Sequence, residues 1–313
     1  MSVDVSSPST SSTGGPAAID AVPLRHPWRW VAAIDIIILV GLFIYGAATN
    51  EAYGWGTFGK YILDERIVNG IWITIQLTVL SMILAIVVAV ILAVMRLSPN
   101  PVLRSVSWVY LWIFRGTPVF VQLVFWGLIP TIYKNLQFGI PFGPTFFHLN
   151  IQNLSMYFLL AILGLGFNEA AYLAEIIRAG ISSVPEGQSE ASTALGMSWL
   201  LTMRRTVLPQ AMRVIIPPTG NEFIGQLKTT SLAVAVPFTL DVFGRQRDIA
   251  GVIFQPVPLL LVAAAWYLLI TSILMVGQFY LERYFSRGVS RKLTGKQLQA
   301  LAEAQTLGEA GHA

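Results

Sequence analysis

The sequence has no cysteine, which excludes disulfide bonds, thiolate metal sites and thiol chemistry. Histidine is almost as scarce, with three residues at positions 26, 148 and 312, so we expect no metal site or catalytic centre built on imidazole. Charged residues make up only 12% of the 313-residue chain, about half the share found in soluble domains. Hydrophobic residues make up 55%, and a surface so poor in charge indicates an integral membrane protein.

The sequence also lacks a phosphate-binding loop and a recognisable set of catalytic residues. These two absences narrow the range of possible functions. The pattern G-x-x-x-x-G-K-[ST] is missing, because neither Gly59-Lys60 nor Gly295-Lys296 fits it, so the chain has no ATP site of that kind. No Ser/His/Asp set and no carboxylate pair with a nucleophile stands out, so we predict no catalytic residue. The basic residues follow the ends of apolar segments, which argues against a nucleic-acid partner.

Six apolar segments are long enough to cross a bilayer as helices, which takes about 20 residues at 1.5 Å each. They are residues 30–48, 67–95, 105–129, 154–181, 207–227 and 257–280. The third is interrupted by Arg115-Gly116-Thr117-Pro118. Residues 130–153 are expected as a loop against the membrane surface, and residues 229–255 as a segment that dips back or covers the outer face. The prediction is an all-α membrane protein with about six transmembrane helices.

Lysine and arginine fall mainly on one side of these six spans. An even number of spans puts both termini on the same side as the turn at 96–104 and the polar insert after the fourth span. That side carries twelve basic residues, which are Arg25, Arg29, Arg96, Arg104, Arg178, Arg204, Arg205, Arg283, Arg287, Arg291, Lys292 and Lys296. The opposite loops carry three, which are Lys60, Arg66 and Lys134. By the positive-inside rule, both termini and the insert are predicted to be cytoplasmic.

The polar insert, Pro185–Pro209, is too long for a simple turn between membrane helices. Ser183-Val184-Pro185-Glu186 fits a capping box with proline in the first turn of a helix. Gly196 can then turn the chain in a left-handed conformation, and Ser198 can cap a second short helix that ends near Leu208-Pro209. Such a pair of helices is either an inert surface feature or a docking element, and we favour docking.

This insert resembles the EAA loop of ABC transporter permeases. The pattern of that loop is EAA, three residues, G, nine residues, I, one residue, LP, and the spacing here matches throughout. The corresponding positions are Glu190, Ala191, Ser192, Gly196, Leu208 and Pro209. Two positions depart from the pattern, because Ser192 replaces the third small residue and Thr206 stands where Ile is usual. The runs that resemble the polar amino-acid branch of these permeases are 115–118, 171–176, 183–188, 217–223 and 227–232.

The resemblance covers about residues 65–285 and implies a fold and a set of partners. Residues 1–24 are expected as a disordered cytoplasmic tail, and residues 25–64 as an extra N-terminal helix with an outer loop. Residues 65–285 are expected as a five-helix type I importer core, with the coupling loop at 185–209. Residues 286–313 are expected as a cytoplasmic tail. Two cytoplasmic ATP-binding subunits would bind ATP and Mg, and this chain would bind no cofactor. The coupling loop would seat in a cleft of an ATPase subunit, with Glu190 facing a basic partner.

Further partners are implied on the other surfaces. They are a second permease copy or a homologous permease, an extracytoplasmic amino-acid-binding protein, and membrane lipids.

Polar residues within the spans are the candidates for the substrate path, because an ionisable group at membrane depth needs a partner or a function. They are Arg115, Thr117, Asn168, Glu169 and Lys228. Arg115 can line the path or pair with one of the acids at 169, 175 and 222. Asn168 and Glu169 can meet an ammonium group or bond between helices. Lys228 can meet a carboxylate or pair with an acid.

Three nearby polar positions are not assigned to the substrate path. Glu175 and Arg178 are spaced for a local ion pair on one helix. Asp is common in the resembling branch where Thr229 stands, so a carboxylate role at that position does not carry over.

These observations predict the permease subunit of an ATP-driven importer of polar amino acids, located in the cytoplasmic membrane of a bacterium and working by alternating access. The substrate stays open, since two acids in the fourth span and one in the fifth (Glu169, Glu175 and Glu222) favour a cationic amino acid. Arg115 and Lys228 favour an acidic or neutral one. The alternative is an ion-coupled secondary amino-acid carrier, which would leave the polar insert unexplained. A membrane enzyme or a structural protein is disfavoured by the missing catalytic constellation.

Overall fold

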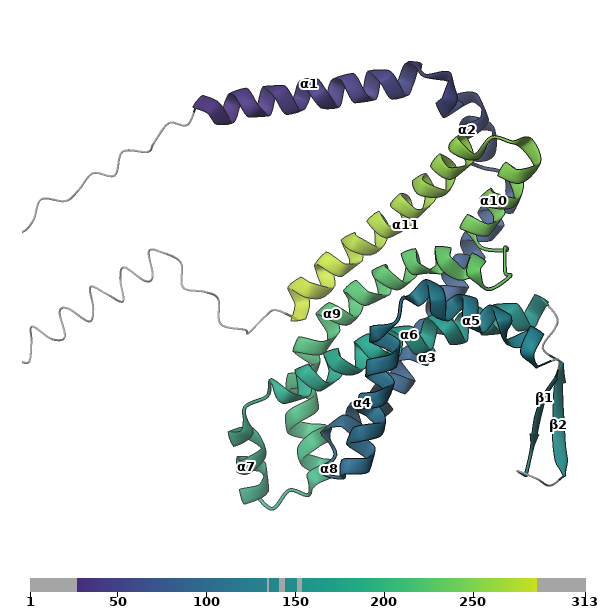
Figure 1. Cartoon of the computed structure of the whole chain (residues 1–313). Coiled ribbons are helices and arrows are strands. Elements are labelled where there is room, and N and C mark those ends of the chain that lie inside the picture. Colours follow the sequence, from purple (N-terminus) through teal and green to yellow (C-terminus); the bar gives the residue numbers. More distant parts are fainter. Residues whose placement is uncertain (1–26, 134, 141–143, 151–153, 286–313) are drawn as a thin grey trace, which may run out of the picture. The chain divides into compact units, whose positions relative to one another are not determined.

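The computed structural model describes residues 27–133, 135–140, 144–150 and 154–285 (Figure 1). The chain divides into two compact units, residues 1–53 and 54–313, and each is described by itself. The first unit contains α1 (Pro27–Thr49), followed by a short 3₁₀ turn at Glu51–Tyr53. The tails predicted at 1–24 and 286–313 lie outside the described residues.

The second unit is built mainly of helices. They are α2 (Trp55–Tyr61), α3 (Glu65–Leu97), α4 (Pro101–Gly116), α5 (Val119–Ile132), α6 (Leu154–Ser182), α7 (Glu186–Ala194), α8 (Trp199–Thr202), a π-helical turn (Met203–Val207), α9 (Leu208–Thr229), a 3₁₀ helix (Thr230–Ala235), α10 (Val242–Ile253) and α11 (Pro256–Phe285). A two-stranded sheet of β1 (Asn135–Gly139) and β2 (Thr145–Asn150) follows α5.

Four of the described helices are long and apolar enough to cross a membrane, namely α1, α3, α6 and α11. The pair α4 and α5, bent by 102° at the break between them, makes a fifth crossing if it is counted as one span. The predicted all-α membrane fold is therefore confirmed. α9 corresponds to the fifth predicted span and has 22 residues, but two internal prolines and several polar residues keep it outside this apolar group.

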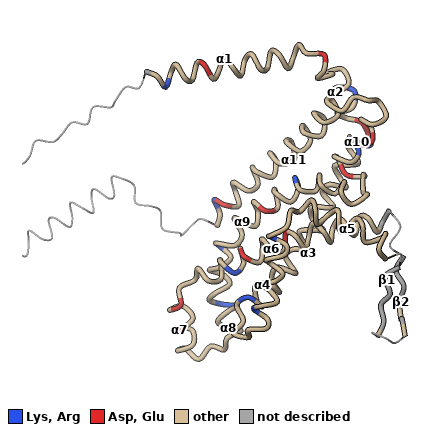
Figure 2. Tube along the Cα trace, viewed as in Figure 1, with Lys and Arg blue, Asp and Glu red and all other residues tan. Residues whose placement is uncertain are grey.

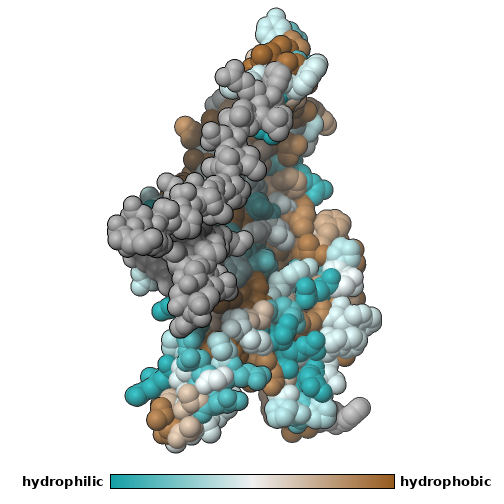
Figure 3. Space-filling model, turned by 90° about the vertical axis from the view of Figure 1, so that its left-hand side faces the viewer, coloured by the Kyte–Doolittle hydropathy of each residue, from teal (hydrophilic) through white to brown (hydrophobic). Residues whose placement is uncertain are grey.

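Charge and hydropathy follow this division into membrane helices and a polar end. Figure 2 shows a long uncharged stretch along α11, and a basic residue, Arg283, lies in its last turn. In Figure 3, hydrophilic residues gather toward the lower end of the visible face, where Figure 1 has α7 and α8. This distribution is the one that a bilayer requires of a helical protein.

The helix ends are set by the residues that the sequence supplies there. Asp64 caps α3 by accepting a hydrogen bond from the backbone N of Arg66 at 3.0 Å. Asn100 caps α4 through Val102 N at 2.9 Å, with Pro101 in the first turn. Proline there loses no helical hydrogen bond, because the first N–H groups of a helix have no partner within it. The turn predicted at 96–104 is thus confirmed.

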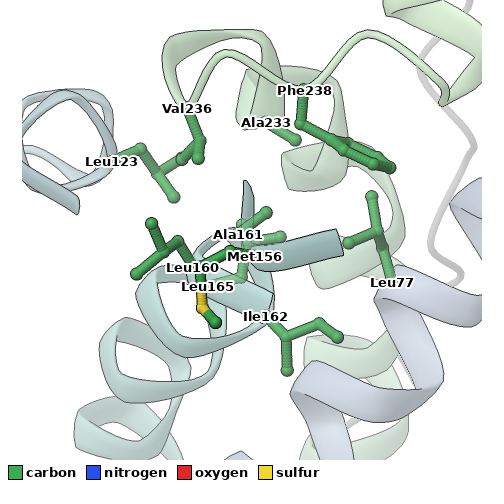
Figure 4. Close-up of a cluster of buried hydrophobic side chains, with 10 residues drawn as sticks. All are labelled: Leu77, Leu123, Met156, Leu160, Ala161, Ile162, Leu165, Ala233, Val236 and Phe238. Carbon is green, nitrogen blue, oxygen red and sulfur yellow. The ribbon is translucent and has the colours of Figure 1, made fainter. Parts of the chain in front are cut away.

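The main hydrophobic core lies where α3, α5, α6 and the segment at 233–238 meet (Figure 4). Its buried members are Leu77, Leu123, Met156, Leu160, Ala161, Ile162, Leu165, Ala233, Val236 and Phe238. α3 and α6 approach closely, and a Cβ added at Gly166 would lie 2.7 Å from Leu84 Cδ2 and 3.0 Å from Ser81 O. In lipid, helix association depends on such close packing rather than on exclusion of water.

The segment predicted as a loop at 130–153 contains an antiparallel β-hairpin. Leu136 pairs with Leu149, and Phe138 pairs with Phe147. The run NLQFG alternates polar and apolar residues, and the run TFFHLN is rich in β-formers, so a strand signal was present in the sequence. The prediction of a loop missed this hairpin because proline and glycine at 139–144 dominate the local composition.

Candidate functional site

A cavity of about 500 Å³ lies where the break between α4 and α5 meets α6 and α9. It is lined by Arg115, Gly116, Thr117, Pro118, Val119, Asn168, Glu169, Tyr172, Glu222, Gly225, Gln226 and Thr229. The lining residues of α6 fall at 168, 169 and 172 and those of α9 at 222, 225, 226 and 229, so each helix contributes one face. Four of the five predicted path residues meet in this cavity; Lys228 does not.

The break between α4 and α5 is held by side chains of α5 and α6. The last carbonyls of a helix have no partner within it, and no water is available at membrane depth. Gln122 Nε2 donates to the carbonyl oxygens of Phe114 at 2.9 Å and Thr117 at 3.0 Å. Asn168 Nδ2 donates to the Phe114 carbonyl at 3.2 Å and to Gln122 Oε1 at 3.1 Å. The predicted interruption of the third span is therefore confirmed. Of the two roles considered for Asn168, the structure shows the hydrogen bond between helices.

Two carboxyl groups stand in the cavity wall, Glu169 on α6 and Glu222 on α9. Glu169 is only 6% exposed, and its Oε1 atom is buried without a hydrogen-bond partner in the part of the chain that the structure describes. An unsatisfied buried acceptor costs about 1–3 kcal/mol. Glu169 thus lines the cavity and carries an unsatisfied carboxyl oxygen that is shielded from solvent.

Arg115 supplies the opposite charge in the same cavity. Its guanidinium lies over the ring of Tyr172, 5.5 Å from the ring centroid. Within the described residues it forms no ion pair with an acid, so the pairing considered from the sequence is not observed. Glu175 is occupied by Arg178 at 2.8 Å, which confirms the predicted local pair. The guanidinium is thus available to an anionic group in the cavity.

A second cavity of about 490 Å³ shares part of its wall with the first. Arg115, Gly116 and Tyr172 line both cavities. The remaining lining residues are Arg96, Trp108, Leu111, Trp112 and Glu175. The described residues contain no group of three or more His, Cys, Asp or Glu side chains that could hold a metal ion.

Gln226 and Thr229 line the site although they were not predicted from the sequence, whereas Lys228 was predicted there. Lys228 is exposed and lies outside the cavity lining, and no ion pair of its ammonium group occurs within the described residues. Positions 222, 226 and 229 share a helix face, whereas position 228 is rotated by about 100° from 229. The face could have been found from the spacing of Glu222, Gln226 and Thr229.

The polar insert forms two short helices, as predicted, but with different ends. Gly196 turns the chain at φ +76° between α7 and α8. The capping box is absent, because Ser183 Oγ bonds to the carbonyl of Gly180 and no side chain caps α7. The second helix does not end near Leu208-Pro209 but continues through the π-helical turn into α9. The wider turn accommodates Pro209, which has no N–H to donate.

The outer surface of the insert combines the predicted docking residues with apolar ones. Glu190, Ala191, Gly196, Leu208 and Pro209 are exposed, whereas Ser192 is buried. Three apolar side chains beside the glycine turn are also exposed, namely Leu195 at 82%, Trp199 at 70% and Leu200 at 69%. Clustered exposed apolar groups with a polar rim are typical of interaction surfaces.

The two positions that depart from the EAA pattern contact each other. The hydroxyl oxygens of Ser192 and Thr206 lie 3.0 Å apart and share a hydrogen bond. The two departures from the pattern therefore form a polar pair.

Known proteins of one family resemble this chain in sequence. Residues 84–287 match the family described as the binding-protein-dependent transport system inner membrane component. The chain is 59% identical over 296 residues to the arginine transport system permease protein ArgU of Corynebacterium glutamicum, covering 94% of this chain and 92% of that protein. It is 35% identical over 209 residues to the histidine/lysine/arginine/ornithine transport system permease protein HisM of Escherichia coli K12, covering 66% of this chain and 83% of HisM.

A solved structure agrees with these matches. The crystal structure of an amino acid ABC transporter with histidines superimposes with a TM-score of 0.58 at 30% identity. The match covers 70% of this chain and 94% of that one.

Proposed function

Because the chain belongs to the family of binding-protein-dependent transport system inner membrane components and is the permease subunit of an amino-acid ABC importer, we propose that it carries a cationic amino acid through the cavity beside Glu169. The predicted permease family and transport function are confirmed. The comparisons give no support to an ion-coupled carrier. The chain is a multi-pass membrane protein that works with ATPase subunits and a substrate-binding protein.

The observation that carries the substrate proposal is the unpartnered Oε1 of Glu169 in the cavity wall. The cavity holds two carboxyl groups and one guanidinium, so its formal charge is complementary to an amino acid with one net positive charge. Its volume of about 500 Å³ lies in the range of about 300–1,000 Å³ typical of small-molecule sites. The names of the relatives ArgU and HisM, which specify arginine and other basic amino acids, agree with this assignment.

The same cavity can orient a zwitterion. We assign the positive groups of the substrate to Glu169 and Glu222, and its α-carboxylate to Arg115. Thr117 contributes a hydroxyl beside Arg115. Asn168 shapes the wall, because its amide donors already bond to Phe114 O and Gln122 Oε1. Lys228, outside the lining, is assigned no contact with the substrate.

The test is uptake by proteoliposomes that contain the permease, its ATPase and its binding protein, with a panel of labelled amino acids. Basic amino acids should be transported in preference to neutral and acidic ones. Glu169→Gln should raise the KM for them by about 10- to 100-fold, since a hydrogen bond to a charged group contributes about 1.5–3 kcal/mol. Glu65→Gln, at an exposed carboxylate in the first turn of α3, is the matched control. Equal transport of all classes, or an unchanged KM in Glu169→Gln, would refute the proposal.

The polar insert is proposed as the site at which the ATPase docks. Its exposed apolar group of Leu195, Trp199 and Leu200 would enter a cleft of that subunit, and Glu190 would meet a basic residue at the rim. ATP and Mg are bound by two such subunits, and hydrolysis takes place there. Disruption of copurification with the ATPase by Trp199→Asp would support this assignment, and an unchanged complex would contradict it.

The assembly and its orientation follow from the same proposal. Two permease copies, or this chain and a homologous one, stand on two ATPase subunits, with the amino-acid-binding protein on the opposite face. Both termini and the insert are cytoplasmic, as the distribution of Lys and Arg indicates. Membrane lipids surround the apolar helices. Labelling of a single cysteine introduced at Ser198 or at Gly56 in intact cells would test this orientation.

A further inference from the structure

Two hydrogen-bonded contacts join α7 to the start of α9. Ser192 Oγ donates to the carbonyl of Gln188 at 2.8 Å and lies 3.0 Å from Thr206 Oγ1. A serine hydroxyl has one proton, so Thr206 is the donor and Ser192 the acceptor between the two side chains. Gln210 Nε2 donates to Gln188 Oε1 at 3.3 Å and to the carbonyl of Thr206 at 2.9 Å.

These contacts form a regular ladder, which we call the α7–α9 clamp and define as Gln188, Ser192, Thr206 and Gln210. The two residues of each partner are four apart, so each pair lies on one face of its helix. Gln188 is matched with Gln210, and Ser192 with Thr206. Ser192 is 5% exposed, so water does not compete effectively for its contact.

The clamp lies at one end of a continuous helical path to the cavity. Thr206 belongs to the π-helical turn that leads directly into α9, and Gln210 belongs to the first turn of α9. The same helix carries Glu222 and Thr229 in the cavity wall. The chain that connects α7 to α9 contains the Gly196 turn and could absorb a displacement, so the clamp is the hydrogen-bonded link between them among the described residues.

We infer that the Ser192–Thr206 hydrogen bond fastens α7 to α9, so that displacement of the insert is passed along α9 to the Glu222 wall of the cavity. This inference rests on the proposed docking of the ATPase at the insert. Ser192 and Thr206 are positioning residues, since neither lies in the lining of the cavity. Their role is to transmit movement between the docking surface and the substrate site.

The test is a double-mutant cycle in the full reconstituted transporter, measured as amino acid transported per ATP hydrolysed. Ser192→Ala and Thr206→Val should each lower this ratio by about 3- to 10-fold, the size expected for one lost hydrogen bond. The double variant should be no more impaired than either single variant, because each single substitution already removes the same hydrogen bond. Thr206→Ser, which keeps the hydroxyl, should retain the ratio.

The matched control is Thr219→Val on the same helix. The hydroxyl of Thr219 bonds only to the carbonyl of Ile215 on its own helix among the described residues, so its removal should leave the ratio unchanged. The inference would be overturned if both single variants kept the wild-type ratio. It would also be overturned if the fold decrease in the double variant equalled the product of the two single decreases. Failure of the wild type to show ATP-dependent uptake would instead refute the proposed function.

A second measurement uses the absence of native cysteine. Ser192→Cys combined with Thr206→Cys should form a disulfide on oxidation, since the hydroxyl oxygens that the thiols replace lie 3.0 Å apart. If α7 and α9 move together, the oxidised protein keeps its coupled uptake. Loss of uptake on oxidation with recovery on reduction would show that the two helices must separate, and failure to form the disulfide would show that the contact does not persist. Either result would overturn the inference.

Discussion

Replacing Gln122 with leucine should weaken the break between α4 and α5 more than the loss of one side chain would suggest. The amide of Gln122 donates to the carbonyl oxygens of Phe114 and Thr117 and accepts from Asn168. Leucine has a similar volume, so the substitution removes hydrogen bonds without opening a large cavity. The groups that Gln122 satisfied remain in place and lose a partner.

The magnitude follows from the burial of those groups. Asn168 is 8% exposed, so one of its donors would be left unsatisfied at a cost of about 1–3 kcal/mol. The Phe114 carbonyl keeps its bond from Asn168, and Thr117 is exposed. We therefore expect a loss of about 2 kcal/mol, which corresponds to a Tm lower by roughly 4–8 °C.

The assay is thermal unfolding of the detergent-solubilised protein, followed by the fluorescence of its nine tryptophans, together with uptake in proteoliposomes. Gln76→Leu is the matched control, because Gln76 is half-buried on α3 and has no hydrogen bond of its side chain within the described residues. Uptake by Gln122→Leu should fall even at temperatures where the protein is folded, since the break forms one wall of the cavity. A Tm and an uptake rate equal to those of the wild type would refute this account of the break.

Three further predictions concern single side chains. Glu190→Ala should leave the protein inserted but uncouple uptake, and wild-type uptake at matched expression would contradict the docking role. Tyr172→Leu should raise the KM by about 3- to 10-fold through loss of the cation–π contact with Arg115, whereas Tyr172→Phe should not; equal KM values would contradict it. The hydrogen bond from Arg66 lowers the pKa of Asp64, so its contribution to stability is present at neutral pH and is lost as the pH falls below about 4. Asp64→Asn should remove this part of the acid dependence of Tm, and an unchanged pH profile would exclude the contribution.

The sequence was informative wherever a local residue determines the backbone. The sequence predicted a turn at 96–104, where α4 begins at Pro101, and Gly196 marked the left-handed turn in the insert. The run Arg115 to Pro118 marked the interrupted span. Each of these signals acts within a few residues, so one stretch of sequence contains the whole cause.

Features that depend on the partner of a side chain were harder to predict. The sequence showed that Pro209 disturbs a helix, but not that a π-helical turn would absorb the disturbance and let the chain continue into α9. Arg115 had three acids within plausible reach in the sequence, and it lies over Tyr172 instead. Lys228 was predicted as a residue of the substrate path because of its charge. Its angular position around the axis of α9 keeps it out of the cavity lining. These outcomes depend on helix rotation and packing, which no single segment encodes.

The 102° bend between α4 and α5 also has a consequence for hydrophobic matching. The two helices contain 16 and 14 residues, so a straight helix of that length would measure about 45 Å. A hydrocarbon core is only about 30 Å thick, and a straight segment would need a steep tilt or a thickened bilayer. Bent by 102°, the same pair has an end-to-end distance of about 30 Å. The bend that shapes the cavity thus also brings the two ends of an overlong apolar segment to a separation close to the thickness of a hydrocarbon core.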